Sequence, residues 1–501
     1  MKQIISIALL TIFTGIFSSC TDWLDQKSYS EVGGNELYQT ESGAQEALNG
    51  LYLGLAGSTL YGGELTVGLL EALSMHYSIP ADHKYEEVTN AEYNTSASKS
   101  TFLSIWKGCY KLIAECNVFL TQIEQNQTSY DADNYKLLRG EAIALRTFLH
   151  FDLFRMFAPA WSEENKTQKA IPYYNREVNQ PLDYMTCEEI VEQLLEDVDE
   201  AIALLAKDPI LGQVSESKQE AIPDVTFWNF RNFRFNIYAA YALKARICLH
   251  AGDKISAYAI TTALLKGRNP EGESVNFMDV FPAVTTLGSN FTDPLCYTET
   301  LFGMHDFDRE DLFKRYFSTE LQPTSICAMS DTRYGELFKQ VDDIRRRYFV
   351  LTERESQTEA ENTSYRAITK WQYKTVPQGW QLPYRYQTIP LIRKAEIFLM
   401  AAESSDNDTD KQYWLEELRL TRGFKKDNVS GDVNTMLQEE YERELYAEGQ
   451  YFYFLKRNGI TKLKTQTENE VQGGQESGSK MVSASYYVLP IPEEETNNRI
   501  N

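Results

Sequence analysis

The stretch GEAIALRTFLHFDL, residues 140–153, decides the fold of this chain. It lies inside residues 135–157, where apolar side chains recur every three or four positions, and this spacing predicts an α-helix. Two carboxylates, Glu141 and Asp152, share the helix with arginines. Such neighbours usually form a satisfied ion network or a solvated face. We therefore expect these carboxylates to be structural, although a buried carboxylate can also serve as a catalytic acid.

The same periodicity extends along most of the chain and predicts a mostly α-helical protein. Helices are predicted at 42–55, 102–124, 186–206, 232–250, 254–266, 388–403, 411–422 and 434–457. Strand patterns are short and few, at 301–304 and 487–490. Long irregular stretches are predicted at 74–101, 207–230, 267–335 and 351–387. Long loops that are rich in aromatic residues favour a binding function on a rigid scaffold.

One predicted helix pair has the spacing of a tetratricopeptide (TPR) repeat. Ala245 and Ala257 lie on either side of the turn at Gly252 and Asp253. Small residues at these positions let two helices approach closely. An ordinary antiparallel helix pair would explain the same residues.

The last predicted long helix carries a charged residue on its apolar stripe. The stripe consists of Leu437, Tyr441, Leu445, Glu448 and Phe452. Glu448 should therefore point inward, and a buried carboxylate needs a partner. We expect this partner to be an arginine of the same helix, such as Arg443 or Arg457.

The N-terminus resembles a lipoprotein export signal. Lys2 precedes an apolar run at 4–17, which is too short to span a membrane, and Ser18-Ser19-Cys20 follows it. Small residues before a cysteine resemble a bacterial lipobox, which predicts a signal peptide at 1–19 and lipid attachment at Cys20. Acyl chains contribute about 0.8 kcal/mol per buried CH₂ group, so a multiply acylated cysteine would anchor the chain stably. The alternative is a soluble secreted protein in which Cys20 is incidental.

Composition excludes several classes of partner and site. The net charge of −23 makes nucleic acid and anionic lipid poor partners. None of the seven cysteines forms a C-x-x-C pair, and Cys109 and Cys116 are predicted to be packed rather than paired. The five histidines form no close set of metal ligands. No cofactor is required by these features. The acidity is compatible with a structural calcium ion, although no D-x-[DN]-x-[DN]-G loop is present.

Several motifs, in order along the chain, resemble those of the SusD/RagB nutrient-binding lipoproteins. They are Cys20-Thr21-Asp22-Trp23-Leu24-Asp25; Trp106, Tyr110 and Asn117; Gly140-Glu141-Ala142, Leu145-Arg146 and Phe151-Asp152-Leu153; Arg393-Lys394-Ala395-Glu396 with Ala402-Glu403; Arg443 with Glu444-Leu445 and Glu448-Gly449; and Leu489-Pro490-Ile491-Pro492 with Glu495 and Asn498. The sequence departs from the family at Tyr451 and Phe454, where an Arg and an Asp are usual. Losing both charges destabilises a fold far less than losing one of them, because losing one would leave the other ion buried without a partner.

The resemblance implies a SusD-like α-helical fold that contains TPR-like helix pairs. Residues 20–266 would form the N-terminal helical region with these pairs, and residues 267–501 the C-terminal RagB/SusD region with irregular loops and the final helices. It also implies a lipid-anchored protein on the outer face of the outer membrane. There it would capture an oligosaccharide or other nutrient and deliver it to a SusC-like TonB-dependent transporter, without catalysis.

In the resembled family, ligands lie against aromatic residues on loops. Two aromatic segments without helical spacing are the candidates here: Tyr77, Asp82, Tyr85, Tyr93 and Asn94 in the first, and Trp371, Tyr373, Trp380, Tyr384 and Tyr386 in the second. Trp380 is the best single candidate because Gly379 and Pro383 indicate a loop. The alternative for any one ring is that it covers the core.

Two other functions remain compatible with the sequence. A surface glycoside hydrolase would need two carboxyl groups about 5–9.5 Å apart, and no pair is recognisable from the sequence. A TPR-like adaptor that contacts only proteins would leave the aromatic loops without a ligand.

Overall fold

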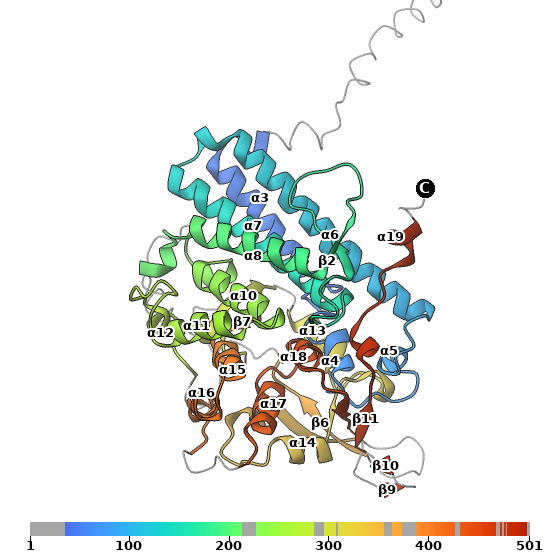
Figure 1. Ribbon diagram of the computed structural model, residues 1–501. Helices are drawn as coiled ribbons and strands as arrows, with labels where there is room; N and C mark the ends of the chain where they lie inside the picture. The colour runs from blue at the N-terminus through green and yellow to red at the C-terminus, as the bar shows by residue number, and fades with distance from the viewer. Residues whose placement is uncertain are drawn as a thin grey trace, which may run out of the picture.

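The computed structural model describes residues 36–212, 227–284, 295–306, 309–354, 363–372, 387–425, 431–466, 471–472, 475–476 and 478–497. The predicted signal peptide and Cys20 therefore lie outside the described residues. α-Helices are the most frequent of the described elements, and the strands are short (Figure 1).

The N-terminal half is a stack of long helices around α7 (Figure 1). Its helices are α3 (Glu41–Leu55), α4 (Leu69–Leu73), α5 (Glu86–Thr89), α6 (Ser96–Gln125), α7 (Ala132–Phe157), α8 (Cys187–Leu204), α10 (Ile237–His250), α11 (Lys254–Leu265) and α12 (Phe277–Val280). A two-stranded sheet of β1 (Lys169–Pro172) and β2 (Tyr184–Thr186) lies between α7 and α8. From Leu137 to Phe157, α7 is buried on nearly every side, because it packs against α6 and α8 and also contacts α3 and α10.

The motif glycine on α7 has a packing role. A Cβ atom at Gly140 would lie 3.0 Å from side-chain atoms of both Leu204 and Leu205. The absence of a side chain at this position therefore lets the end of α8 approach α7 closely.

Side-chain caps determine where the helices begin. Thr95 accepts a hydrogen bond from the Ser98 amide and starts α6 six residues before the predicted position, inside the stretch predicted to be irregular. Thr186 and Glu189 form a capping box at the start of α8. Asp253 caps α11 after the turn at Gly252, as the TPR-like spacing predicts.

The C-terminal half combines shorter helices with small antiparallel sheets. Its helices are α13 (Arg309–Tyr316), α14 (Asp331–Leu337), α15 (Lys394–Ser404), α16 (Asp408–Thr421), α17 (Val433–Glu444), α18 (Tyr451–Arg457) and α19 (Glu493–Asn497). Its strands are β3 (Thr300–His305), β4 (Met329–Ser330), β5 (Phe349–Arg354), β6 (Thr363–Ile368), β7 (Thr388–Arg393), β8 (Lys462–Lys464), β9 (Val471–Gln472), β10 (Gln475–Glu476) and β11 (Ser479–Met481). Strands β4, β6 and β5 form one sheet in that order, and the remaining strands pair as β3–β7, β8–β11 and β9–β10.

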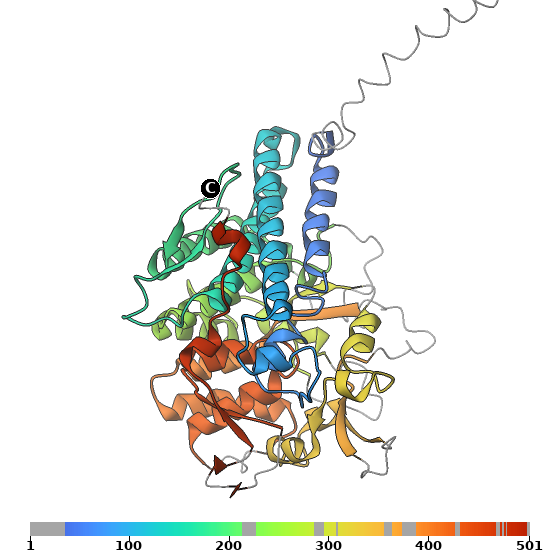
Figure 2. The same cartoon turned by 90° about the vertical axis from the view of Figure 1, so that its right-hand side faces the viewer.

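The two halves share one hydrophobic core. Helix α15 packs against α10 and α11, and Arg246 on α10 donates to Glu396 on α15 with an Nε–Oε1 distance of 2.7 Å. The C-terminal α19 returns to α6, where Lys99 and Lys107 pair with Glu493 and Glu494 (Figure 2). Among the described residues, no helix has the length and apolar character needed to cross a membrane.

Three predicted elements differ in the structure. Residues 388–393 form the buried strand β7 and not the start of a helix, because they pair with β3. The predicted strand at 487–490 is absent: the chain there follows a 3₁₀ turn at Ala484–Tyr487. The predicted helix 434–457 is broken between α17 and α18, where Ala447 and Gly449 adopt positive φ angles.

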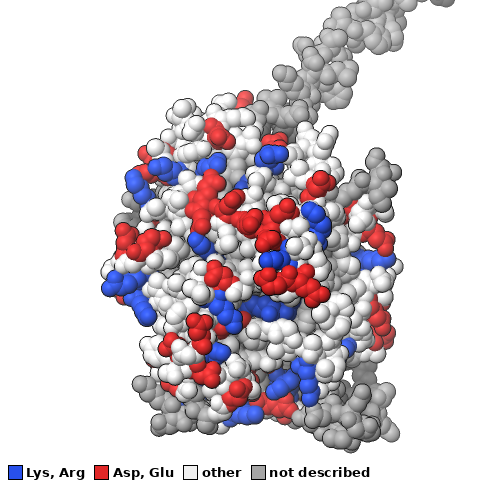
Figure 3. All heavy atoms as spheres, viewed as in Figure 1, with Lys and Arg blue, Asp and Glu red and all other residues white. Residues whose placement is uncertain are grey.

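The cysteine prediction is confirmed for the described residues. Cys109 and Cys116 are buried free thiols, as are the four later cysteines. Figure 3 shows acidic and basic side chains interspersed on one face of the molecule, and the exposed side chains of α8 are mainly acidic.

Candidate functional site

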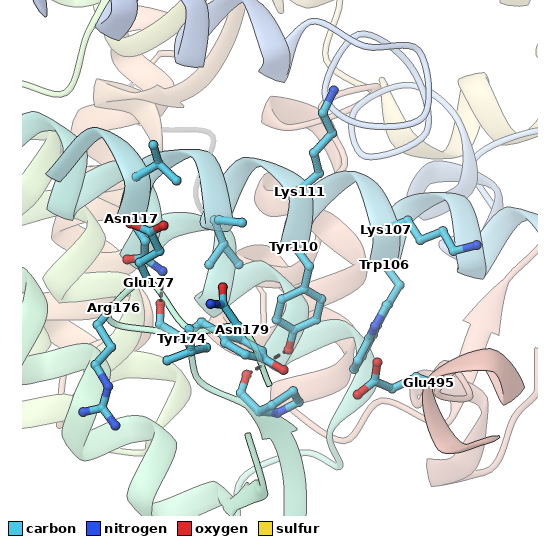
Figure 4. Close-up of a pocket in the computed structure, with 15 residues that line it drawn as sticks. Trp106, Lys107, Tyr110, Lys111, Asn117, Tyr174, Arg176, Glu177, Asn179 and Glu495 are labelled. Atoms are coloured by element: carbon cyan, nitrogen blue, oxygen red, sulfur yellow. Dashed lines mark hydrogen bonds between the residues drawn. The ribbon is translucent and has the colours of Figure 1, made fainter. Parts of the chain in front are cut away.

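A cavity of about 580 Å³ lies beside α6 and is the candidate functional site (Figure 4). Its inner wall is one face of α6, where Trp106, Tyr110, Ile113 and Asn117 follow one another at spacings of four, three and four residues. The segment 172–179 between β1 and β2 forms the opposite wall, and Glu495 of α19 lies at one end. The cavity thus joins three segments that are distant in sequence.

Hydrogen bonds fix the two walls relative to each other. The Tyr110 hydroxyl donates to the Pro172 carbonyl oxygen (2.9 Å), and the Asn117 amide donates to the Tyr174 carbonyl oxygen (2.9 Å; Figure 4). Arg146 on α7 donates to the Asn117 side-chain oxygen (2.8 Å). The family-like residues of α6 and α7 therefore hold the 172–179 segment in place from behind.

A neutral histidine supports the same segment. The backbone N–H of Tyr174 donates to Nε2 of His150 (3.0 Å), so the proton of this ring lies on Nδ1, which faces the Arg146 carbonyl oxygen at 3.0 Å. Burial, together with the nearby Arg146 guanidinium, lowers the pKa of His150 to about 3. The Tyr173 ring stacks on this imidazole at 3.9 Å. The support is therefore uncharged and rigid at neutral pH.

The cavity combines aromatic surface with a polar rim. Tyr110 contacts Trp106 at 4.8 Å between ring centroids and meets the Tyr174 ring edge-to-face at 5.6 Å. The exposed polar residues around it are Lys107, Lys111, Arg176, Glu177 and Asn179. An apolar wall with a few polar groups suits a ligand that has both an apolar face and hydrogen-bonding groups.

The two carboxylates of the cavity are not arranged as a catalytic pair. Figure 4 places Glu177 and Glu495 at opposite ends of the cavity. A glycosidase holds its two carboxyl groups on either side of one bond. Within the residues that the structure describes, no group of three or more His, Cys, Asp or Glu side chains could hold a metal ion.

The buried carboxylates of the sequence motifs have structural partners. Glu448 is bound by Arg393, with nitrogen–oxygen distances of 2.8 and 2.7 Å, and by Lys370. The predicted partners, Arg443 and Arg457, are wrong, because the break between α17 and α18 turns Glu448 toward β7. Asp152 pairs with Arg155 and accepts from the Tyr61 hydroxyl.

Three predicted ligand-binding rings lie in the interior. Tyr77, Tyr85 and Trp371 have exposed fractions of 2%, 3% and 0%. The polar atom of each ring donates to a protein oxygen, which is a backbone carbonyl for Tyr77 and Trp371 and a carboxylate for Tyr85. These rings cover the core and have no face open to a ligand.

The remaining predicted residues are placed apart from the cavity or are not described. Tyr93 is half-buried and packs edge-on against Phe102 at 5.5 Å, and Asp82 is exposed with a φ of +67°. The residues Tyr373, Trp380, Tyr384 and Tyr386 lie outside the described residues.

Sequence reasoning missed the segment that forms the outer wall. Tyr174, Arg176 and Asn179 lie in an aromatic and polar run between Pro172 and Pro181, a composition typical of a constrained loop. The cavity also shows that Trp106 and Tyr110, identified as motif residues, line a surface hollow.

Two family models match the chain. One, described as "Starch-binding associating with outer membrane", matches residues 22–249, and the other, described as "SusD family", matches residues 332–501. No curated protein matches the chain in sequence.

Several solved structures of Bacteroides proteins have the same fold. A protein of Bacteroides vulgatus described as a putative sugar binding protein is 19% identical, with a TM-score of 0.66 over 92% of this chain and 96% of that one. A SusD superfamily protein of Bacteroides thetaiotaomicron is 18% identical, with a TM-score of 0.64 over 91% and 98%. Surface glycan-binding protein A of the same organism, in complex with laminarihexaose, is 17% identical, with a TM-score of 0.61 over 91% and 97%.

The two family models cover both halves of the chain, in family order, and the helical fold agrees with them. The chain therefore belongs to the SusD family.

Proposed function

We propose that this protein captures oligosaccharides at the cell surface and passes them to a SusC-like TonB-dependent transporter in the outer membrane. Its membership of the SusD family is the observation that carries this proposal. The complex of a relative of the same fold with laminarihexaose supports a carbohydrate as the ligand class. The lipobox-like sequence supports an anchor at Cys20 on the outer face of the membrane.

The cavity beside α6 is the proposed glycan site. Sugar rings present apolar C–H faces that can lie on the half-buried rings of Tyr110 and Tyr174, while their hydroxyl groups need donors and acceptors. Arg176, Glu177 and Asn179 supply both kinds of group at the rim. The fixed wall between α6 and the 172–179 segment would lower the entropic cost of binding.

A glycan screen tests the binding proposal. Mature protein without Cys20 should bind at least one oligosaccharide, and the double variant Arg176→Ala/Asn179→Ala should weaken that binding at least tenfold, since a charge-assisted hydrogen bond contributes about 1.5–3 kcal/mol. Lys254→Ala, an exposed change at the start of α11, serves as the control and should bind normally.

We propose that binding requires no metal, so affinity measured by calorimetry should be unchanged in EDTA, whereas a dependence on calcium would identify a structural ion.

The same samples separate binding from hydrolysis and from a protein-only adaptor. We expect the bound glycan to remain intact, with no release of reducing ends after prolonged incubation. Release that stops in Glu177→Gln would establish the hydrolase instead. Failure to bind any glycan would favour the adaptor.

Two further experiments test the lipid anchor and the contact with the transporter separately. Cys20→Ala should abolish acylation and release the protein from the outer membrane fraction. The anchored protein should co-purify with the SusC-like transporter, and its absence from that complex would contradict the delivery step.

A further inference from the structure

A second cavity, of about 520 Å³, lies between the C-terminal half of α3, the segment 227–234 and the end of β3. Six of its lining residues are apolar or aromatic: Tyr52, Leu53, Phe227, Phe230, Phe233 and Met304. The other four are Asn49, Asn229, Arg234 and His305. It shares no residue with the cavity beside α6.

Three phenylalanines of one short segment face this cavity. Phe227, Phe230 and Phe233 are all only partly buried, although phenylalanine is among the residues most often found inside proteins. Phe230 has φ 53° and ψ 47°, a left-handed conformation that bulky residues rarely adopt. Such a conformation costs on the order of 1–3 kcal/mol and persists only where the surrounding structure holds it.

Buried interactions hold the segment in this conformation. Arg231 is 1% exposed and donates to both carboxylate oxygens of Asp208, at 2.9 and 2.8 Å, and to the Phe235 carbonyl oxygen at 2.9 Å. Its remaining nitrogen binds Glu141 on α7. The phenylalanine-bearing segment is therefore fixed to the central helix before any ligand arrives.

The charge of Arg234 in the cavity wall is balanced by buried carboxylates behind it. Arg234 lies over the Phe227 ring, with 3.6 Å from the guanidinium carbon to the ring centroid, and faces Glu141 at 3.4 Å. With Arg231 and Asp208, these residues form a group of two cations and two anions. Burial lowers the pKa of His305, which favours the neutral ring at pH 7. A neutral ligand is therefore favoured.

The lining also selects the chemistry of that ligand. Each sugar hydroxyl buried without a partner would cost about 1–3 kcal/mol, and the three phenyl rings offer no partners. An aromatic group has no such cost and gains about 0.5–1.5 kcal/mol from each well-placed ring contact beyond area burial. An apolar cavity of about 150 Å³ already accommodates benzene, so this cavity has room for an aryl group and an attached sugar ring.

We propose that this cavity is a second ligand site, and that it binds a neutral aryl group carried on a sugar. The aryl group lies among Phe227, Phe230 and Phe233, and the sugar ring lies toward Asn49 and Asn229. The site extends the specificity of the protein from plain glycans to aryl-substituted ones.

Paired glycosides test this proposal. Calorimetry would compare the 4-nitrophenyl and methyl β-glycosides of glucose, galactose and xylose. We expect at least one aryl glycoside to bind tenfold or more tightly than its methyl counterpart. Phe233→Ala should remove this preference. Leu53→Glu should do the same without disturbing the core, because Leu53 is 59% exposed at the rim.

Two variants serve as controls. Ile255→Glu, at an exposed apolar position on α11, should leave aryl binding unchanged. Arg176→Ala should also leave it unchanged, which separates this site from the proposed glycan cavity. Three results would overturn the proposal. The protein could bind aryl and methyl glycosides with equal affinity, or bind none of the three aryl glycosides. The third is that Leu53→Glu binds aryl glycosides normally. Loss of aryl binding in Arg176→Ala would assign the ligand to the cavity beside α6 instead.

Discussion

Glu141 joins three parts of the molecule through one carboxylate. From α7 it accepts a hydrogen bond from the Tyr52 hydroxyl of α3 (2.9 Å) and binds Arg231 and Arg234 of the phenylalanine-bearing segment. It is completely buried. A buried ion with such partners is structural, and removing its charge would leave Arg231 and Arg234 to share the one remaining carboxylate, that of Asp208.

We therefore predict that Glu141→Gln destabilises the fold by about 3–5 kcal/mol. Urea unfolding followed by circular dichroism would measure the change. Glu200→Gln is the matched control: this exposed residue of α8 pairs with Arg139 at 2.9 Å, and its loss should cost less than about 1 kcal/mol. Equal stability of the two variants would contradict the structural role of Glu141.

The departure from the family pattern at Tyr451 and Phe454 has a structural counterpart. Tyr451 stacks on His76 at 5.0 Å and on Phe454 at 5.9 Å, and Phe454 stacks on Tyr441 at 4.2 Å. A column of aromatic rings thus occupies the positions of the two charges that other members of the family usually carry. Because both charges are absent together, no buried ion is left without a partner.

Among the elements, the break between α17 and α18 depends on a distant carboxylate. Glu71 on α4 accepts hydrogen bonds from the backbone N–H groups of Ala447 (2.8 Å) and Gly449 (2.7 Å). These are the two residues with positive φ, and periodicity alone continues the helix through them. The turn is therefore specified by a contact between two segments that lie 376 residues apart in the sequence.

Gly449 is the residue of this turn at which an added side chain should destabilise the fold most. Its φ is +73°, and a Cβ atom there would lie 2.2 Å from the Leu65 carbonyl oxygen. Gly449→Ala should lower the unfolding free energy by more than about 3 kcal/mol, as the sum of backbone strain and a clash with fixed backbone.

Gly459→Ala is the matched control for the backbone term. Gly459 also has a positive φ, of +60°, but a Cβ atom there would have no neighbouring atom within 4 Å. This variant should cost only about 1–2 kcal/mol. Comparing the denaturant midpoints of Gly449→Ala and Gly459→Ala would separate the cost of backbone strain from the cost of the clash. Identical midpoints would rule out the clash at Gly449.

Element prediction succeeded where local pattern and packing agree. The helices around Ala44 and Leu48 and around Ala257 were correctly predicted because their buried faces follow the helical period. Residues 388–393 are buried throughout and carry no distinguishing period, so their strand state follows only from pairing with β3. The first residue of α6 is set by the capping side chain of Thr95 and not by the apolar period.

For the whole molecule, a buried ion network joins the sheets and helices of the C-terminal half. Its members include Glu299, Asp343, Arg345, Lys370, Arg393, Arg419, Arg422, Glu440, Arg443, Glu444 and Glu448. Burial alone would raise the pKa of Glu440, but Arg345, Arg443 and Arg419 outweigh it and lower this pKa to about 2. The pKa of Glu444 is also held well below its ordinary value, against the effect of burial, by Arg422 and Arg393.

These shifts predict that acid weakens the fold. The depressed pKa of Glu440 supplies stability above the unfolded value of about 4.3, and this stability is lost as the pH falls toward 2. His150 acts in the same direction: the unfolded ring takes up a proton near pH 6.5, whereas the folded ring resists protonation down to about pH 3.

We expect the unfolding free energy to fall by more than about 2 kcal/mol between pH 7 and pH 4, and further below pH 4. Urea titrations at constant ionic strength would measure it, together with proton uptake on unfolding. A free energy that stays constant over this interval would show that the buried groups do not keep the stated protonation states.

The sequence by itself determined the helical class, the packed thiols and the family. These properties depend on side chains repeated along one helix, or on motifs read in order. Only the tertiary structure decided the partners of Glu448, the turn at Gly449 and the two cavities. Each of these requires segments far apart in the chain to meet, and the helical period carries no information about which distant segment arrives.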